Sequence, residues 1–237
     1  MQESGLRDAR HAALDLQTLL VATAEVESFL GEVARRAVGV VGQAHSRGIT
    51  VQLGASSPVL GATSDELARR MDAAQYVVDD GPCPTCLRRG VTVSVTDIHT
   101  DPRWPAFTRR GAEQGAGSSL SVPLAVRETT VGALNLYSRT AHGLSDDDRT
   151  RATEFARHAA AAVALAAQRA ENEQRLYHLE AALQSRSVID QAMGVLMAQA
   201  HVTVDEAFGI LRRRSQHSNI KLRDVAAAVV ADATRKR

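Results

Sequence analysis

The stretch that most constrains this chain lies between Gly143 and Gly194, where the sequence contains no other glycine and no proline. It opens with "SDDD". A serine followed by acidic residues is typical of a helix start, because these side chains complement the free amides and the dipole of the first turn. We therefore expect one long helix to begin after Ser145, and the other elements to be arranged around it.

A stripe of side chains at spacings of three and four runs along this helix. It is apolar at both ends and polar in the middle, where Arg169 and Asn172 lie. On so long a helix, such a stripe usually faces a partner helix, most simply a second copy in a parallel coiled coil. We expect a homodimer whose weakly packed middle lets the helix register shift. The dimer-helix residues are Phe155, Ala162, Ala166, Leu176, Leu179 and Leu183. The alternative is a single helix that packs on a sheet over its first half and carries exposed ion pairs over its second.

Before the long helix, short helical segments alternate with runs that read as strands. The strand runs are 48–54, 91–95, 118–126 and 130–138, and "RETT" joins the last two as a hairpin. Residues 8–44 read as helical with a break near Thr23, and Thr63 with Glu66 matches a capping box before "ELARRMDAAQ". This hairpin-like succession favours an antiparallel α+β sheet over a doubly wound parallel sheet.

Three short amphipathic patterns follow residue 185. Thr203 with Glu206 matches a capping box at the start of the second pattern. Each apolar stripe needs the other two in order to be buried, so the sequence predicts a three-helix bundle. The stripes are Val188, Ile189, Ala192, Val195 and Leu196; Val204, Ala207, Phe208 and Leu211; and Leu222, Val225, Ala226, Val229 and Val230.

The outer face of the first of these helices carries small or uncharged side chains. At about 100° per residue, Ser187, Gln191 and Gly194 fall opposite the apolar stripe. Gly194 costs the helix about 1 kcal/mol relative to alanine, so we expect it to serve close approach of a large ligand. The segment from Arg186 onward has a net charge of +4, and we expect a basic rim beside this strip. The alternative is that "RRR" is a solvated face and that Gly194 permits tight packing against a neighbouring helix.

The same segment resembles the ANTAR domain, a three-helix RNA-binding module of bacterial antiterminators, through "SRSVIDQAMGVLM" and "DEAFGILRRRSQHSNIKLRDVA". The resemblance implies that a dimer binds a pair of small RNA hairpins in a nascent mRNA leader. The family commonly has lysine where this chain has Met193. Because that cation is missing, recognition of the RNA loop matters more relative to attraction of the phosphates. The expected RNA-binding residues are Ser187, Gln191, Gly194, Arg212, Arg213, Ser215, Asn219, Lys221 and Arg223.

Residues 23–168 resemble a GAF domain, a sensor fold, through "GPC", "VTDIHTDPRWPAF", "SSLSVPLAV" and "VGALNLYS". The resemblance implies an antiparallel sheet with helices on both sides. It names no cofactor, because GAF domains bind cyclic nucleotides, tetrapyrroles, metals or no known ligand. Whether a small molecule acts as the signal is therefore left open by the resemblance. The candidate sensor-pocket residues are Tyr76, Cys83, Cys86, Trp104, Phe107 and Tyr137, although aromatic side chains more often belong to a core.

Cys83 and Cys86 form a C-x-x-C pair at an expected helix start, where the helix dipole favours the thiolate. Three interpretations are open: ordinary packing, a reversible disulfide that senses redox state, and half of a zinc site. No second C-x-x-C is present to complete a zinc site, so we expect no metal.

No catalytic motif stands out, since H-E-x-x-H, G-x-x-x-x-G-K and G-x-G-x-x-G are all missing, and we expect no enzyme activity. The sequence has no signal peptide and no apolar run long enough for a membrane span, so we expect a cytoplasmic protein. The expected parts are an N-terminal helix at 1–22 associated with the dimer, a GAF-like domain at 23–168, a coiled-coil linker at 169–185 and an ANTAR-like domain at 186–237. The expected function is signal-responsive antitermination. The alternatives are a DNA-binding regulator and a thiol-redox sensor.

Overall fold

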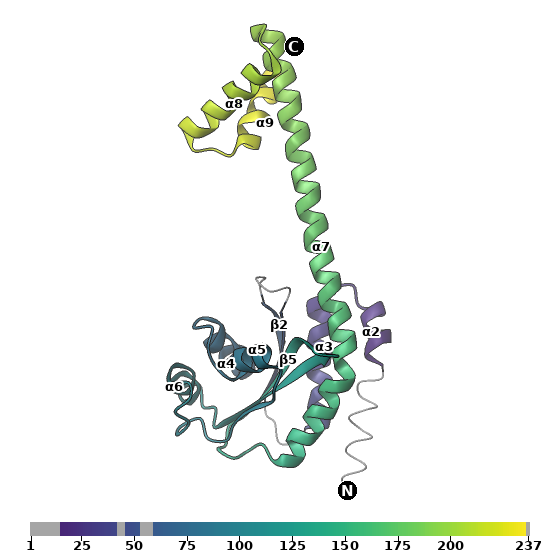
Figure 1. Ribbon diagram of the computed structural model, residues 1–237, viewed down its shortest axis with the longest axis vertical. Coiled ribbons are helices and arrows are strands. Elements are labelled where there is room, and N and C mark those ends of the chain that lie inside the picture. Colours follow the sequence, from purple (N-terminus) through teal and green to yellow (C-terminus); the bar gives the residue numbers. More distant parts are fainter. Residues whose placement is uncertain (1–14, 42–45, 53–58, 236–237) are drawn as a thin grey trace. The chain divides into compact units, whose positions relative to one another are not determined.

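The computed structural model describes residues 15–41, 46–52 and 59–235 (Figure 1). Contacts divide the chain into two units, 1–171 and 172–237, and one helix, α7 (Asp146–Ala200), belongs to both. The first residues of the predicted N-terminal helical segment, 1–14, lie outside the described residues. No helix in the described part of the chain is long and apolar enough to cross a membrane.

The N-terminal unit is built on a five-stranded antiparallel sheet with strand order β2-β1-β5-β4-β3. The strands are β1 (Ser46–Gln52), β2 (Val59–Thr63), β3 (Val93–Val95), β4 (Ser118–Val126) and β5 (Thr129–Ser138). β4 and β5 form the predicted hairpin, with Ser118 opposite Ser138 and Val126 opposite Thr129. The predicted antiparallel α+β class is therefore confirmed.

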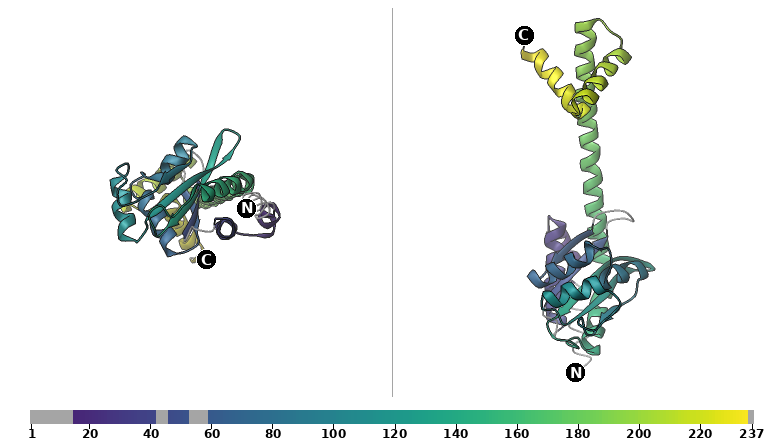
Figure 2. Two further views of the ribbon diagram at one scale, coloured as in Figure 1. Left: turned by 90° about the horizontal axis from the view of Figure 1, so that it is seen from below. Right: turned by 90° about the vertical axis from the view of Figure 1, so that its left-hand side faces the viewer.

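Helices cover both faces of this sheet (Figure 2). One face packs against α2 (Leu16–Ala22), α3 (Val26–Val40) and the first part of α7. The other face packs against α4 (Glu66–Tyr76), α5 (Pro82–Arg89) and α6 (Pro105–Glu113). The break predicted near Thr23 separates α2 from α3, and the Thr23 hydroxyl donates to the Leu19 carbonyl at 2.7 Å.

The two faces of the sheet differ in polarity because successive side chains of a strand point to opposite sides. The face towards α3 and α7 is apolar and carries Ile49, Val51, Leu120, Val122, Leu124, Leu134 and Leu136. The residues between them turn towards α4 and α5, and these include Thr50, Ser119, Ser121, Asn135 and Tyr137. This second face is polar and yet buried.

Two local predictions before α7 are wrong. No strand is predicted at β2, which nevertheless pairs with β1 along its whole length. The predicted capping box of Thr63 and Glu66 does not form, because Asp65 caps α4 by accepting a hydrogen bond from the Ala68 N–H at 3.0 Å. Glu66 instead accepts hydrogen bonds from the exposed guanidinium of Arg69.

Helix α7 begins as predicted but ends later. Ser145 and Asp148 form a reciprocal cap, in which the Asp148 N–H donates to Ser145 Oγ at 3.1 Å and the Ser145 N–H donates to Asp148 Oδ2 at 3.0 Å. The helix then continues to Ala200, so the first helix of the predicted bundle is the last part of α7.

The first half of the predicted dimer stripe is wrong. Phe155, Ala162 and Ala166 are at most 2% exposed and lie in the core beneath the apolar sheet face. They pack within their own unit, as the single-helix alternative predicts for this half, and are not available to a partner helix.

The C-terminal unit contains the last part of α7, α8 (Val204–Ser218) and α9 (Leu222–Arg235), as the three-helix prediction requires. Its buried core is Ala192, Leu196, Ala207, Leu211, Ala226 and Val229. The predicted capping box forms, since Thr203 accepts from the Glu206 N–H and Glu206 accepts from the Thr203 N–H. The predicted α8 stripe is wrong at Val204 and Phe208, which are 51% and 41% exposed.

Candidate sensor site and nucleic-acid interface

Helix α4 and the polar sheet face meet in a buried hydrogen-bonded cluster. Asp72 Oδ1 accepts hydrogen bonds from the Asn135 side-chain amide, at 3.1 Å, and from the Tyr137 hydroxyl. Asn135 also donates to Thr50 Oγ1 at 3.2 Å and accepts from the Ser121 hydroxyl at 2.8 Å. These five residues, Thr50, Asp72, Ser121, Asn135 and Tyr137, are called the Asp72 cluster below.

Two further side chains of α4 tie this cluster to the start of α5. Gln75 Nε2 donates to the Tyr137 hydroxyl at 3.1 Å, and Gln75 Oε1 accepts from the Cys83 N–H at 2.8 Å. The Tyr76 hydroxyl shares a hydrogen bond with Thr50 Oγ1. The Asp72 cluster and these two side chains therefore join helices α4 and α5 to strands β1, β4 and β5.

The Asp72 carboxyl is buried without an ion pair among the described residues. Burial raises its pKa to about 7, and the hydrogen bonds from Tyr137 and Asn135 only partly oppose this shift. Gly48 makes room for the carboxyl, because a Cβ there would overlap Asp72 Oδ2. Next to the cluster on the same sheet face, Ser119 Oγ is buried and has no hydrogen-bond partner in the described part of the chain. Such polar burial is costly for a core and suits a site that meets a polar signal.

The structure gathers most of the predicted sensor-pocket residues. Cys83, Cys86, Trp104, Phe107 and Tyr137 are buried in one cluster between the polar sheet face and helices α4 to α6. Tyr76 lies at its edge, half-buried. The Arg103 guanidinium stacks over the Trp104 ring, 4.5 Å from its centroid, and covers this cluster from outside.

The two thiols are less reactive than their position at a helix start suggests. Burial raises the pKa of Cys83 to about 12 and that of Cys86 to about 12. The expectation that this helix start favours the thiolate is therefore wrong, because desolvation by burial raises the pKa of both thiols. No group of three or more His, Cys, Asp or Glu in the described residues is placed to hold a metal ion.

Sequence reasoning missed the centre of the site, namely Asp72, Gln75 and Asn135. A signal was present, because Asn135 interrupts the apolar run "ALNLY" and turns its polar amide to a face that its neighbours bury. Asp72 and Gln75 likewise fall on the buried side of α4 beside Met71. Neither signal names a partner without the strand pairing that brings them together.

On the C-terminal unit, the predicted strip on α7 is open. Ser187, Gln191 and Gly194 are exposed, and a Cβ built on Gly194 meets nothing within 4 Å. Within the described chain, the alternative that Gly194 permits tight helix packing is therefore wrong. The Gln191 side-chain amide donates to Ser187 Oγ at 3.5 Å along this strip.

The basic residues of α8 and of the turn after it have mixed roles. Arg212 and Arg213 are exposed as predicted. Ser215 instead holds the turn, since its hydroxyl donates to the Ile220 carbonyl at 2.6 Å, and Asn219 ends α8 in a left-handed conformation with φ 53°. The Lys221 carbonyl accepts hydrogen bonds from the N–H groups of the first turn of α9. The exposed Arg223 forms an ion pair with Asp224 at 3.4 Å.

The strip and the basic rim do not adjoin. Ala192 and Leu196 pack in the core with α8 and α9. At about 100° per residue, Gly194 lies roughly 160–200° around α7 from these two residues. The strip therefore faces away from α8 and α9, and the predicted interface is two separate surfaces.

The second half of the predicted dimer stripe is exposed. Leu176, Leu179 and Leu183 are 59%, 57% and 60% exposed. Arg169, predicted in the weak middle of the stripe, instead donates to the carbonyls of Thr23 and Ala24, at 3.1 and 2.6 Å. These bonds attach α7 to the junction between α2 and α3.

Comparison with family models finds a GAF domain at residues 23–164 and an ANTAR domain at residues 177–230. No curated protein matches the chain. Similar solved structures include a putative GAF sensor protein from Burkholderia vietnamiensis, 16% identical, which covers 69% of this chain and 98% of its own with a TM-score of 0.51.

The GAF domain of a phosphoenolpyruvate-protein phosphotransferase from Coxiella burnetii is 15% identical and covers 70% of this chain and 98% of its own with a TM-score of 0.50. Free methionine-R-sulfoxide reductase from Neisseria meningitidis is 17% identical and covers 68% of this chain and 91% of its own with a TM-score of 0.49. At these identities the likenesses show the fold alone.

Proposed function

Because this chain belongs to the GAF domain family and carries an ANTAR domain after its GAF domain, we propose that it binds RNA hairpins as a dimer under the control of a signal at the GAF domain. The domain pair supports a GAF-regulated antitermination regulator, and both domains are sensor or regulatory modules, not enzymes. The observation that carries the proposal is that the ANTAR match at 177–230 falls on the unit formed by α7, α8 and α9.

The proposed partner is a pair of small hairpins in a nascent mRNA leader. Two exposed surfaces are available to it, the flat strip at Ser187, Gln191 and Gly194 and the basic side of α8 at Arg212 and Arg213. Cations on α8 attract the phosphates of any RNA, whereas an open backbone at Gly194 admits close contact that a longer side chain would block.

The proposed dimer forms through the exposed leucines of α7. Leu176, Leu179 and Leu183 recur at coiled-coil spacing, and no core residue of the C-terminal unit covers them. A dimer would place two ANTAR domains side by side and suits a ligand made of two hairpins.

The proposed signal path runs from the Asp72 cluster through the sheet to α7. The cluster joins α4 and α5 to β1, β4 and β5, and α7 packs on the opposite face of the same strands. Arg169 then fixes α7 to the α2–α3 junction through two carbonyls. A small polar molecule that rearranges the cluster would shift these contacts and thereby the helix that carries the ANTAR domain.

Gel shifts with the full chain test this proposal. The probes are a two-hairpin RNA selected from a pool with randomised loops, each hairpin alone, and a duplex DNA of equal charge at the same salt. We expect the two-hairpin RNA to bind tighter than either hairpin and than the DNA by at least tenfold. Equal binding of RNA and duplex DNA would favour the DNA-binding alternative. Thiol-disulfide turnover by the buried Cys83 and Cys86 would favour the redox alternative.

A further inference from the structure

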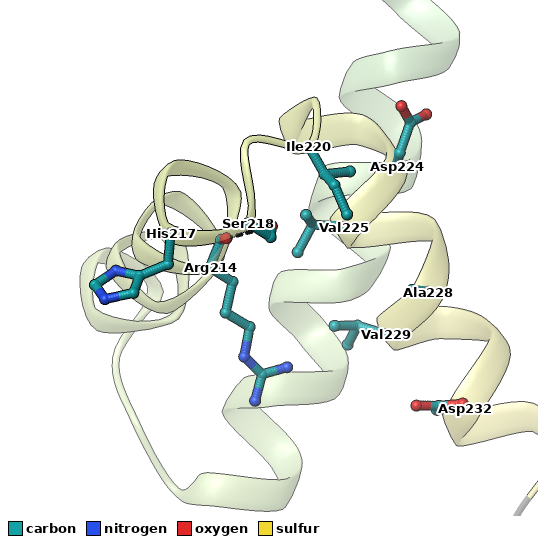
Figure 3. Close-up of a pocket in the computed structure, with 9 residues that line it drawn as sticks. All are labelled: Arg214, His217, Ser218, Ile220, Asp224, Val225, Ala228, Val229 and Asp232. Carbon is teal, nitrogen blue, oxygen red and sulfur yellow. Dashed lines mark hydrogen bonds between the residues drawn. The ribbon is translucent and has the colours of Figure 1, made fainter.

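A groove of about 460 Å³ opens between α8 and α9 of the ANTAR domain (Figure 3). Ile220, Val225, Ala228 and Val229 give it an apolar floor. This volume lies inside the range of about 300–1,000 Å³ that is typical of small-molecule sites. None of these four residues belongs to the RNA interface predicted from the sequence.

Charged side chains of both signs line the groove. Arg214 extends from α8 towards α9, and no hydrogen bond or ion pair to its guanidinium is found in the described residues. Asp232 extends into the groove from the α9 side and pairs with Arg235 only at 3.4 Å, with both side chains more than 70% exposed. A guanidinium plane, an apolar floor and a carboxylate acceptor therefore converge on one space.

This combination excludes some occupants and favours one. A phosphate would be repelled by the Asp232 carboxylate, and an aliphatic side chain would leave the Arg214 guanidinium without a partner. A flat heteroaromatic ring satisfies all three features, because bases stack on guanidinium planes and donate from exocyclic amino groups to carboxylates.

We infer that this groove receives one unstacked nucleobase that bears an exocyclic amino group, from a loop of the bound RNA. The inference rests on the proposed function and names the part of the RNA that this site takes.

The test fills the groove in the full chain and measures binding of the selected two-hairpin RNA. Ala228→Leu places a larger side chain over the floor, and Ala227→Leu makes the same change at an exposed neighbour on α9 that does not line the groove. We expect Ala228→Leu to weaken binding at least tenfold with an unchanged salt dependence, because a base contact is lost and phosphate contacts are kept. Ala227→Leu should bind as the unmodified chain does.

Abasic substitution at each loop position then identifies the nucleotide. At one loop position, loss of the base should lower the RNA affinity of the unmodified chain about tenfold or more. The same abasic RNA should bind Ala228→Leu no more weakly than the intact RNA does. Equal penalties in both proteins, or equal binding by Ala228→Leu and Ala227→Leu, would overturn the inference. Arg214→Gln repeats the test with a different change, in case Ala228→Leu does not fold.

A second measurement separates this inference from the proposed function. Methyl-labelled full chain is titrated with cytidine, adenosine, guanosine and uridine monophosphates, and with ribose 5-phosphate. We expect the NMR signals of the Val225 and Val229 methyl groups to shift with the nucleotides whose bases carry an amino group, even if no two-hairpin RNA binds. Shifts of the same size with ribose 5-phosphate would show a phosphate site and refute the base assignment, and no shifts with any nucleotide would also refute it.

Discussion

Replacing Asp72 by asparagine should make the GAF domain more stable above pH 7 and leave it little changed near pH 4. The folded domain holds the pKa of Asp72 at about 7, whereas an aspartate in the unfolded chain titrates near 3.9. Below pH 4 the carboxyl is protonated in both states. As the pH rises from 4 to 7, only the unfolded state releases the proton, so the free energy of unfolding falls.

The size of the effect follows from the pKa difference. About three units at 1.36 kcal/mol each give roughly 4 kcal/mol of stability that the wild-type chain loses between about pH 4 and pH 7. Asparagine keeps the oxygen that accepts from Asn135 and Tyr137 and does not ionise. The difference in unfolding free energy, Asp72→Asn minus wild type, should therefore rise by up to about 4 kcal/mol across this range.

Urea unfolding followed by tryptophan fluorescence measures this difference from pH 4.5 to pH 8.5. Trp104 is the only tryptophan and lies in the same buried cluster, so its signal reports the N-terminal unit. Subtraction removes the contributions of histidines common to both proteins. The control is Asp101→Asn. Arg103 lowers the pKa of Asp101, so the stability that this carboxylate contributes is lost only as the pH falls and is constant from pH 5 to pH 8. Parallel curves for Asp72→Asn and wild type over that range would refute the argument.

Three further predictions concern the other candidate residues. Charged residues in place of Leu176, Leu179 and Leu183 should give a monomer by light scattering, and an unchanged dimer mass would contradict the α7 dimer. Cys83 and Cys86 should resist a thiol reagent until the GAF domain unfolds, because both are buried with a raised pKa; fast labelling of folded protein would contradict this. Gly194→Leu should leave the melting temperature unchanged or higher, because a Cβ there meets nothing within 4 Å and leucine is the better helix former. It should abolish hairpin binding, because the longer side chain blocks close approach of the RNA. A loss of about 1–3 kcal/mol of stability with normal binding would instead indicate a packing role.

Much of the fold could be predicted because its signals are local. Alternation in "SSLSVPLAV" gives β4 with its observed ends, and the acidic turn after Ser145 gives the start of α7. β2 could not be predicted in this way, since Val59–Thr63 is short, contains Gly61 and is a strand only because it pairs with β1. The end of α7 was misplaced because the linker at 169–185 and the first helix of the bundle were treated as separate helices. No glycine or proline lies between them, and they form one helix that continues to Ala200.

The candidate site was harder to predict than the fold because its residues meet only after folding. Thr50, Asp72 and Asn135 come from β1, α4 and the β4–β5 hairpin, which are far apart in the sequence. Aromatic residues and cysteines attracted attention as chemical groups, whereas the atoms that matter most are a carboxyl and an amide on faces expected to be apolar. A polar residue in phase with a buried stripe is therefore the signal to follow in such a sequence.

The proposed dimer and the proposed RNA contact make demands on the same side of α7. Gly194 follows Leu176 by five helical turns of about 3.6 residues, so the two residues lie in line, and Leu183 lies about 20° away. A coiled coil that continued past Leu183 would bury Gly194 and exclude RNA from it. The residues between them argue against that continuation, because Arg186 and Asp190 lie on this side, exposed and 3.9 Å apart. A coiled-coil seam in which charged residues replace leucines is expected to separate there. Both proposals therefore hold together only if the paired helices separate between Leu183 and Gly194, and a signal that moves this point would expose or cover the glycine.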